Sequence, residues 1–321
     1  MTPRTRDGHA LSLGVDIGGT KSHGLVLDDA DRVLAERVLP TEPSEAGIRR
    51  TVLAVAGALA DDLGTTPASF TSVGLGIPGV VDHTSGVVET AVNLGITRTD
   101  LAALLSRDFC ADVRVENDVK ATALGAGLAL AETQRDLAYV NLGTGLAAAV
   151  VSNGRLVRGA RNGAGEIGHL AIDPAGELCT CGQRGCLETV LGGNYLTRRL
   201  VSLGLDLAGL GGDPRPAAAA ERARVIDALT TTLTLVVITY DPAVVVLGGG
   251  VLRTAGWLRP LVEEELRRRA AVSGFLAGLA VDGRLVELPT ATPVAAIGAA
   301  VVGRKKKLRA RPAAVGAALE G

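Results

Sequence analysis

Cysteine is rare in this chain, and three of its four cysteines fall within one short stretch. They are Cys179, Cys181 and Cys186, and His169 lies ten residues before the first of them. Thiolates and an imidazole are the ligands that a tetrahedral structural zinc prefers, and three cysteines with one histidine form one of its standard closed sets. The spacing therefore predicts a zinc-binding knuckle held by these four side chains.

A disulfide is the alternative interpretation of the same stretch. Cys179 and Cys181 are too close in sequence for easy bridging, and one thiol of the three would be left over. Gly182 and Gly185 fit a tight knuckle between ligands, because glycine reaches backbone conformations that other residues avoid. The pattern favours zinc.

Two carboxylates accompany the knuckle. Glu166 lies three residues before His169, and Glu188 lies two residues after Cys186. Neither is needed by a site of three cysteines and one histidine. Fixed by the knuckle, both could present acceptors to a hydroxylated ligand, with His169 oriented by its bond to the metal. Solvated surface charges are the alternative.

Composition limits the possible classes of protein. The 321 residues are enough for two domains or one large one. Hydrophobic residues make up 47% of the chain and aromatic residues only 2%, so the core must consist of Ala, Val and Leu. A net charge of −1 gives no reason to expect nucleic acid or a membrane surface as the main partner.

No apolar run reads as a membrane span, since residues 233–251 are interrupted by Asp241 and Pro242. Residues 1–9 are polar and lack the apolar core of a signal peptide. We therefore expect a cytoplasmic protein, and a reducing compartment also suits a zinc-thiolate site.

Residues 11–28 alternate between apolar and polar positions on either side of a glycine turn, which predicts a strand, a tight turn and a second strand. A double-glycine turn followed by threonine exposes backbone N–H groups and a hydroxyl, which suits it to phosphate. Asp16, at the end of the first strand, could bind Mg²⁺ directly or through water. An ordinary hairpin is the alternative for this segment alone. The turn consists of Gly18, Gly19, Thr20 and Lys21.

The same plan recurs about 125 residues later, where residues 140–151 again read as strand, polar residue, Gly/Thr turn and strand. Internal similarity of this kind suggests two domains of related topology that share a cleft. A third glycine turn follows a buried-strand run at residues 244–247, after a long helical segment at 217–239. Three such turns favour a nucleotide site. The two later turns are Gly143, Thr144 and Gly145, and Gly248, Gly249 and Gly250.

The sequence excludes two other classes of nucleotide-binding protein, the dinucleotide-binding fold and the P-loop. Residues 73–79 contain G-x-G-x-x-G after a strand, but residues 80–88 then read as a hairpin rather than the helix that a dinucleotide fold requires. The pattern G-x-x-x-x-G-K-[ST] of a P-loop does not occur in the chain.

A short strand at residues 112–116 precedes an apolar helix at about 121–131. Asp118 lies at this junction, as either a helix N-cap or a catalytic carboxylate; capping is the commoner role, and the nucleotide turns favour catalysis. Asn117 offers both a donor and an acceptor to a hydroxyl. At the other end of the chain, residues 293–302 read as an Ala/Gly-rich helix, and the basic residues after 303 read as a solvated tail rather than a nucleic-acid site.

Together these motifs resemble the ROK family of bacterial sugar kinases and repressors, and they look most like its ATP-dependent glucokinases. The resemblance covers residues 11 to about 302. Its motifs are D-I-G-G-T-K at 16–21, G-I-P-G-V-V-D at 76–82, N-L at 93–94, E-N-D at 116–118, G-E-I-G-H at 165–169, C-x-C-G-x-x-G-C-x-E at 179–188 and L-G-G-G at 247–250.

The resemblance implies a role for each matching residue. Asp118 would be the catalytic base, and the sugar would be held by Gly79, Asn93, Asn117, Asp118, Glu166, His169 and Glu188. His169, Cys179, Cys181 and Cys186 would bind structural zinc. ATP with Mg²⁺ would be bound by Asp16, Gly18, Gly19, Thr20, Lys21, Gly143, Thr144, Gly145, Gly248, Gly249 and Gly250.

The implied fold is the two-domain α/β ribonuclease-H-like ATPase architecture of actin and hexokinase, with ATP and sugar in the interdomain cleft. We expect a small domain of residues 1–118 with the helix at about 293–303, a larger domain of residues 119–292 with the zinc knuckle, and a basic tail at 304–321. The implied reaction phosphorylates the primary hydroxyl of a hexose, most simply glucose. The resemblance further implies a homodimer or homotetramer.

Two departures from the family pattern leave the sugar open. Val119 and Lys120 replace a usual Ala-Asn, and Gly95 and Ile96 replace a usual aromatic after Asn93-Leu94. Another hexose, such as fructose or mannose, or an N-acetylhexosamine, such as N-acetylglucosamine or N-acetylmannosamine, is therefore an alternative acceptor, and polyphosphate is an alternative donor. A non-catalytic sugar sensor is a third class, although about ten residues before the first strand are too few for a helix-turn-helix.

Overall fold

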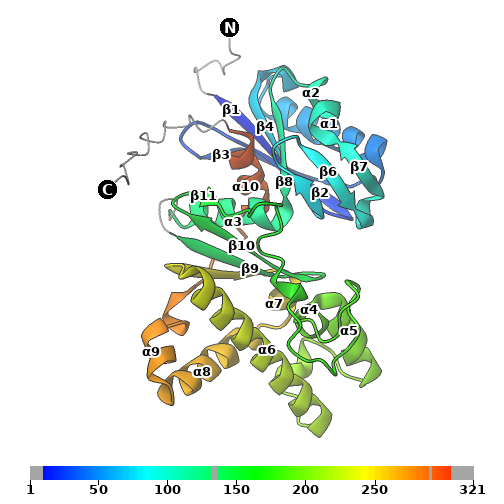
Figure 1. The fold of residues 1–321 in the computed structure, drawn as a ribbon. Helices are drawn as coiled ribbons and strands as arrows, with labels where there is room; N and C mark the ends of the chain where they lie inside the picture. The colour runs from blue at the N-terminus through cyan, green and yellow to red at the C-terminus, as the bar shows by residue number, and fades with distance from the viewer. Residues whose placement is uncertain (1–9, 132–135, 289–290, 305–321) are drawn as a thin grey trace, which may run out of the picture.

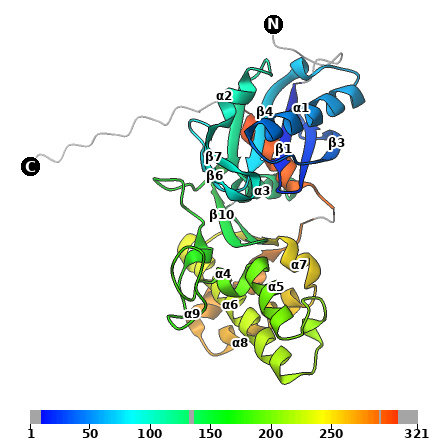
Figure 2. The same ribbon diagram turned by 90° about the vertical axis from the view of Figure 1, so that its right-hand side faces the viewer.

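The computed structural model describes residues 10–131, 136–288 and 291–304, so the predicted basic tail beyond Arg304 lies outside the described residues. The chain forms two five-stranded sheets, one above the other in Figures 1 and 2. A separate sheet of three short strands belongs to the first half. It consists of β5 (Val80–Asp82), β6 (Val87–Ala91) and β7 (Ile96–Asp100). The hairpin predicted after the G-x-G-x-x-G segment is therefore confirmed.

The first sheet has the order β3-β2-β1-β4-β8, with β1 and β2 joined by the first glycine turn. Strands β1, β2 and β3 are antiparallel, whereas β4 and β8 run parallel to β1. The strands are β1 (Leu11–Ile17), β2 (Lys21–Leu27), β3 (Val33–Pro40), β4 (Phe70–Ile77) and β8 (Val113–Asn117).

The second sheet repeats this plan in the order β11-β10-β9-β12-β13. Here β9 and β10 form the antiparallel hairpin, and β12 lies parallel to β9. The correspondence extends to single residues, because Asp16 of β1 lies opposite Gly76 and Asn141 of β9 lies opposite Gly248. The strands are β9 (Leu137–Leu142), β10 (Leu146–Ser152), β11 (Arg155–Leu156), β12 (Val244–Gly248) and β13 (Leu285–Val286).

Helices cover both faces of each sheet. Apolar residues of β1 pack with α1 (Glu45–Asp62) and α2 (Leu101–Ser106) in one core cluster. Alternate residues of β9 pack on opposite faces, Val140 among the long helices of the second half and Tyr139 against α3 (Asp118–Ala129). The remaining helices are α4 (Glu188–Leu191), α5 (Gly193–Ser202), α6 (Pro216–Tyr240), α7 (Gly250–Thr254), α8 (Leu258–Ala271), α9 (Gly274–Leu279) and α10 (Val294–Gly303).

The last helix, α10, returns to the first sheet and lies against it at backbone contact (Figure 1). A Cβ atom on Gly14 of β1 would come within 2.3 Å of the Ala296 carbonyl oxygen, and one on Gly74 of β4 within 1.8 Å of the Ala299 carbonyl oxygen. Gly298 makes an equally close approach to α3. Only glycine permits this packing, because any side chain at these positions would separate the backbones.

Within the described residues, one helix, α6, is long and apolar enough to cross a membrane by length and composition. Its buried apolar residues, Leu229, Leu233 and Val236 among them, belong to the main core cluster of the second half. It also carries a buried charge, Glu221, which is paired with Arg199 at 2.9 Å. The helix therefore has the character of a core helix.

Candidate functional site

Asp118 is the first residue of α3, immediately after β8. The cap of this helix is Asn117, whose side-chain oxygen accepts a hydrogen bond from the Lys120 backbone N–H at 3.1 Å. The N-cap role considered for Asp118 therefore belongs to its neighbour. The Asn117 amide nitrogen also donates to the Gly79 carbonyl oxygen at 3.1 Å, so this side chain ties three segments together.

The two oxygens of Asp118 differ in their surroundings. Oδ1 accepts from the Asn117 amide at 3.0 Å and from the Val119 backbone N–H at 2.9 Å. No hydrogen bond from the described residues reaches Oδ2. Burial raises the pKa of Asp118, the charge of Glu166 raises it further, and the hydrogen bonds oppose the shift. The carboxylate is therefore oriented by the hydrogen bonds to Oδ1, while Oδ2 can accept a proton. This arrangement and the raised pKa suit a general base.

Asp16 lies at the end of β1, close to Asp118. Gly76 lies beside both, since a Cβ there would be 3.6 Å from Asp16 Oδ1 and 3.7 Å from the Asp118 Cα. Burial first, and then the charge of Asp118, raise the pKa of Asp16 to about 7, while Lys21 lowers it. The positive charge of Lys21 does not fully offset the two adjacent carboxylates. Such a pair could bind a cation between them.

The Asp16 carboxylate should make stability depend on pH. Its folded pKa of about 7 lies above the reference value of 3.8, so the carboxyl lowers the free energy of unfolding progressively between pH 3.8 and 7, fully above pH 7 and not at all below pH 3.8. We expect Asp16→Asn to raise the free energy of unfolding by about 1–3 kcal/mol at pH 8 and to leave it nearly unchanged at pH 4. Urea unfolding at both pH values, without nucleotide or magnesium, measures this. Equal stability of variant and wild type at pH 8 would contradict it.

The first two glycine turns are fixed by backbone hydrogen bonds. Gly18 N–H donates to the Lys21 carbonyl at 3.0 Å, and Gly143 N–H donates to the Gly145 carbonyl at 3.0 Å. The start of α5 anchors the second turn, because Gly193 N–H donates to the Gly143 carbonyl at 2.9 Å. Both turns are therefore held in shape by hydrogen bonds within the protein itself.

The third turn lies against β9. A Cβ on Gly248 would come within 2.1 Å of the Tyr139 hydroxyl, and Gly249 has a φ of 103° with the Leu142 carbonyl oxygen 2.2 Å from its Cβ position. Both positions therefore require glycine. The turn ends in α7, which begins at Gly250.

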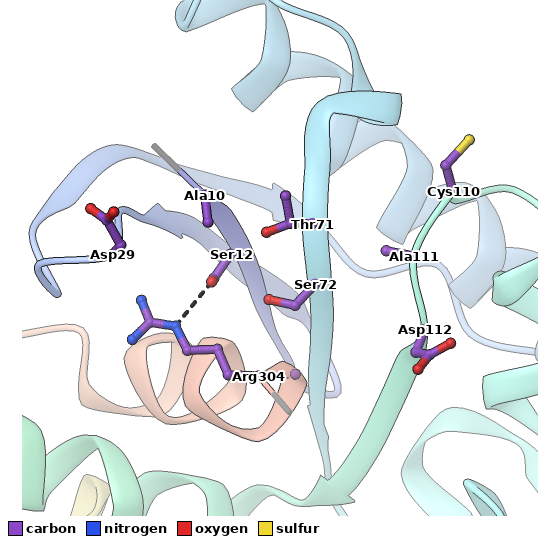
Figure 3. A pocket seen from close by; sticks show the side chains of 10 residues that line it. Ala10, Ser12, Asp29, Thr71, Ser72, Cys110, Ala111, Asp112 and Arg304 are labelled. Atoms are coloured by element: carbon purple, nitrogen blue, oxygen red, sulfur yellow. Dashed lines mark hydrogen bonds between the residues drawn. The ribbon is translucent and has the colours of Figure 1, made fainter. Parts of the chain in front are cut away.

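A cavity of about 330 Å³ lies between the two sheets, and four predicted nucleotide residues line it together with Asp118, the predicted base. Sequence reasoning missed several other lining side chains, because no local pattern marks them. A larger cavity of about 560 Å³, beside Ser12, Thr71 and Arg304, contains no predicted site residue (Figure 3). The predicted residues that line the smaller cavity are Asp16, Asp118, Gly143, Gly249 and Gly250; the missed ones include His23, Thr122, Tyr139, Asn141 and Arg253.

The other predicted nucleotide residues, Gly18, Gly19, Thr20, Lys21, Thr144, Gly145 and Gly248, lie in the same turns but do not line this cavity. Asn93 is exposed near the first turn, with its Cβ 3.8 Å from where a Cβ on Gly19 would lie. Gly79 has a φ of 108°, and a Cβ there would come within 2.0 Å of the Thr90 carbonyl oxygen.

Glu188 connects the knuckle to the second glycine turn. Its Oε2 accepts from the Leu146 backbone N–H at 3.0 Å, and a Cβ on Gly145 would lie 2.3 Å from that oxygen. Glu166 follows Gly165, which has a φ of 99° and accepts a hydrogen bond from Ala148 N–H at 2.8 Å. Both carboxylates are therefore carried by segments packed on β10.

The four predicted zinc ligands converge. The ligand atoms of His169, Cys179, Cys181 and Cys186 all lie within 4.8 Å of one another. Cys179 Sγ is 3.7 Å from His169 Nδ1, and the sulfurs of Cys181 and Cys186 are 3.6 Å apart. These separations suit a tetrahedral ion with bonds of about 2.0–2.3 Å. All four cysteines are free thiols.

The knuckle backbone has the predicted form. Gly182 has a φ of 93° and Gly185 a φ of 69°. Gln183, by its backbone N–H and its amide, lowers the pKa of Cys181 to about 6, whereas burial raises the pKa of Cys186 to about 12. The donor set, the distances and the glycine conformations fit a structural metal ion.

Lys120, which replaces the family's usual small amide, is buried and donates from Nζ to the Asn162 carbonyl oxygen at 2.5 Å. Nearby, Arg158 forms an ion pair of 2.7 Å with buried Glu116. The segment leading to Glu166 is thereby held against β8 and α3. No sequence pattern pointed to these contacts.

Two sheets of equivalent strand order, with carboxylates and glycine turns facing a cavity between them, define the two-domain ATPase fold of the actin and hexokinase type. The ROK hexokinase of Thermus thermophilus has this structure with a TM-score of 0.78 and 30% identity, over 91% of this chain and 97% of that one. The chain belongs to the ROK family, whose model matches residues 12–301.

Relatives in the family differ in what they do. A glucokinase of Thermotoga maritima is 31% identical over 75% of this chain and 82% of its own. An N-acetylmannosamine kinase of Citrobacter koseri is 32% identical over 57% of this chain and 61% of its own. The match to a Halalkalibacterium halodurans glucokinase likewise covers 58% of each chain, so the chain spans about three fifths of the length of these last two relatives. A Streptomyces griseus glucokinase solved with glucose and AMPPNP is 25% identical, with a TM-score of 0.72 over 92% of this chain and 99% of that one.

Proposed function

We propose that this chain is a sugar kinase that transfers phosphate from ATP to the primary hydroxyl of a hexose, with glucose as the preferred acceptor. The observation that carries the proposal is Asp118, held at the head of α3 with Oδ2 uncommitted and its pKa raised by burial. It faces the cavity that Asp16 and two glycine turns also line. The glucokinase relatives support glucose as the acceptor.

In the proposed reaction Asp118 Oδ2 accepts the proton of the sugar hydroxyl as its oxygen attacks the terminal phosphorus. Phosphoryl transfer otherwise requires positioning and neutralisation of charge, with little covalent chemistry by the protein. Asp16 would hold Mg²⁺, which supplies positive charge to the phosphate oxygens when bound. The phosphates would rest on the turns of residues 18–21 and 143–145, and the adenosine would lie near residues 248–250.

The sugar would lie beside Asp118, between the two halves. The effect of the Glu166 charge on Asp118 supports this placement, because such an effect requires proximity. Zinc would fix the knuckle and act on the reaction only through His169 and Glu188. The hydroxyls would be bound by Gly79, Asn93, Asn117, Glu166, His169 and Glu188.

A coupled assay of ADP formation over a panel of hexoses and N-acetylhexosamines tests the proposal. We expect glucose to give the highest kcat/KM with ATP, and polyphosphate to support little turnover. N-acetylmannosamine is the strongest competing acceptor, because a kinase for it is 32% identical over 57% of this chain. Higher kcat/KM with that sugar would replace glucose, and no turnover with any sugar would favour a sensor.

We further propose a cytoplasmic homodimer or homotetramer without a nucleic-acid or membrane partner. The location is supported by the substrates and by the reducing conditions that suit a zinc-thiolate knuckle. Light scattering of the purified chain measures the assembly.

A further inference from the structure

The charge in the cavity between the sheets is unevenly distributed. Of the described residues that line it, Asp16 and Asp118 carry carboxylates and His23 an imidazole, whereas Arg253 alone carries a permanent positive charge. A donor of phosphate brings several negative charges into this space. A cation on this wall would stabilise that charge alongside any metal ion.

The third glycine turn places Arg253 on this wall of the cavity. It belongs to α7, three residues after Gly250, and its Nη2 lies 3.7 Å from where a Cβ on Gly250 would be. The side chain is exposed, and no hydrogen bond or ion pair joins its guanidinium to any described residue. Most arginines of this structure have a carboxylate partner, as Arg158 and Arg199 do. The N–H groups of the Arg253 guanidinium are therefore available to bind a ligand.

Tyr139 lines the same cavity as Arg253 and the two carboxylates. Its phenol lies beside Gly248. Burial raises the pKa of Tyr139 to about 12, the charge of Arg253 lowers it, and the charges of Asp118 and Asp16 raise it. All three charged groups therefore lie near one hydroxyl, which stays protonated and donates to Asn141 Oδ1 at 3.5 Å.

We propose that Arg253 binds the phosphate oxygens of the donor and is a binding residue for the nucleotide. The inference deepens the proposed function and rests on it. A guanidinium presents parallel donors that match two phosphate oxygens, which an ammonium cannot do. Arg253 would thus compensate for the charge that Asp16 and Asp118 bring to the same cavity.

Isothermal titration calorimetry with Mg-AMPPNP tests the proposal. We expect Arg253→Gln to raise the Kd for Mg-AMPPNP about tenfold, and Arg253→Lys to recover part of the loss. The Kd for glucose should stay within about twofold, because the guanidinium does not bind the sugar. Arg107→Gln is the matched control, since Arg107 is exposed at the end of α2, outside the cavity. Thermal unfolding checks that each variant is folded.

The outcomes separate this inference from the proposed function. A Kd for Mg-AMPPNP within twofold of wild type in Arg253→Gln overturns the inference, even if the wild type phosphorylates glucose. Failure of the wild type to bind Mg-AMPPNP overturns it as well. Loss of nucleotide affinity in Arg253→Gln, with no sugar phosphorylated by the wild type, supports the inference and removes the kinase assignment instead.

Discussion

Asp118→Asn should lower kcat by about 10²–10⁴-fold, the usual contribution of a general base, and leave the Kd for glucose within about threefold. The substitution keeps an acceptor for the two hydrogen bonds that now reach Oδ1, from Asn117 and Val119. Only the proton-accepting oxygen is replaced. Steady-state kinetics with a coupled assay, together with calorimetry for glucose, measure the two quantities separately.

Asp100→Asn is the matched control for this experiment. Asp100 also lies at the start of a helix, where its side chain caps α2 by accepting from Ala103 N–H at 2.9 Å, but it does not line the cavity. Its kcat should equal that of the wild type. If Asp118→Asn kept more than a tenth of the wild-type kcat, Asp118 would not be the base.

Removal of zinc should weaken glucose binding before the protein unfolds. The knuckle carries Glu188, which also holds the Leu146 N–H, and it contains His169 itself. The core of the second half depends mainly on residues such as Leu229, Val245 and Leu258, which lie elsewhere in the chain. We expect one zinc per chain, and a Kd for glucose about 10–100-fold higher after chelation, with the far-ultraviolet circular dichroism largely kept.

A variant pair distinguishes zinc loss from a general thiol effect. Cys181→Ser removes a ligand of the knuckle, whereas Cys110→Ser changes the one cysteine outside it. The first should lose zinc and glucose affinity, and the second should keep both. Normal glucose binding by a folded, zinc-free protein would remove the proposed role of the knuckle.

Local patterns were sufficient to predict the hairpins, the glycine turns and the convergence of the zinc ligands. The alternation around Asp16 and its repetition around Asn141 predicted two halves of related topology, and the strand orders agree. The cap of α3 was less predictable, because Asn and Asp are equally good N-caps and stand side by side at residues 117 and 118.

Contacts between distant segments could not be predicted from one sequence. Glu188 binds a backbone N–H 42 residues away, and the Arg158–Glu116 pair joins equally distant positions. Neither contact leaves a periodic signal. The sequence likewise gives no signal that Arg253 and Tyr139 line the same cavity as Asp16, because they meet there only when the two sheets face each other.

The glycine-lined seat of α10 has a consequence for biosynthesis. Residues 11–117 form all five strands of the first sheet, but one face of it is completed only by residues 294–303. A ribosome releases the N-terminal segment long before it reaches that helix. Until that helix is made, Gly14, Gly74 and the apolar side chains of β2 in the nascent first half stay uncovered. We therefore expect a chain truncated before residue 294 to bind chaperones.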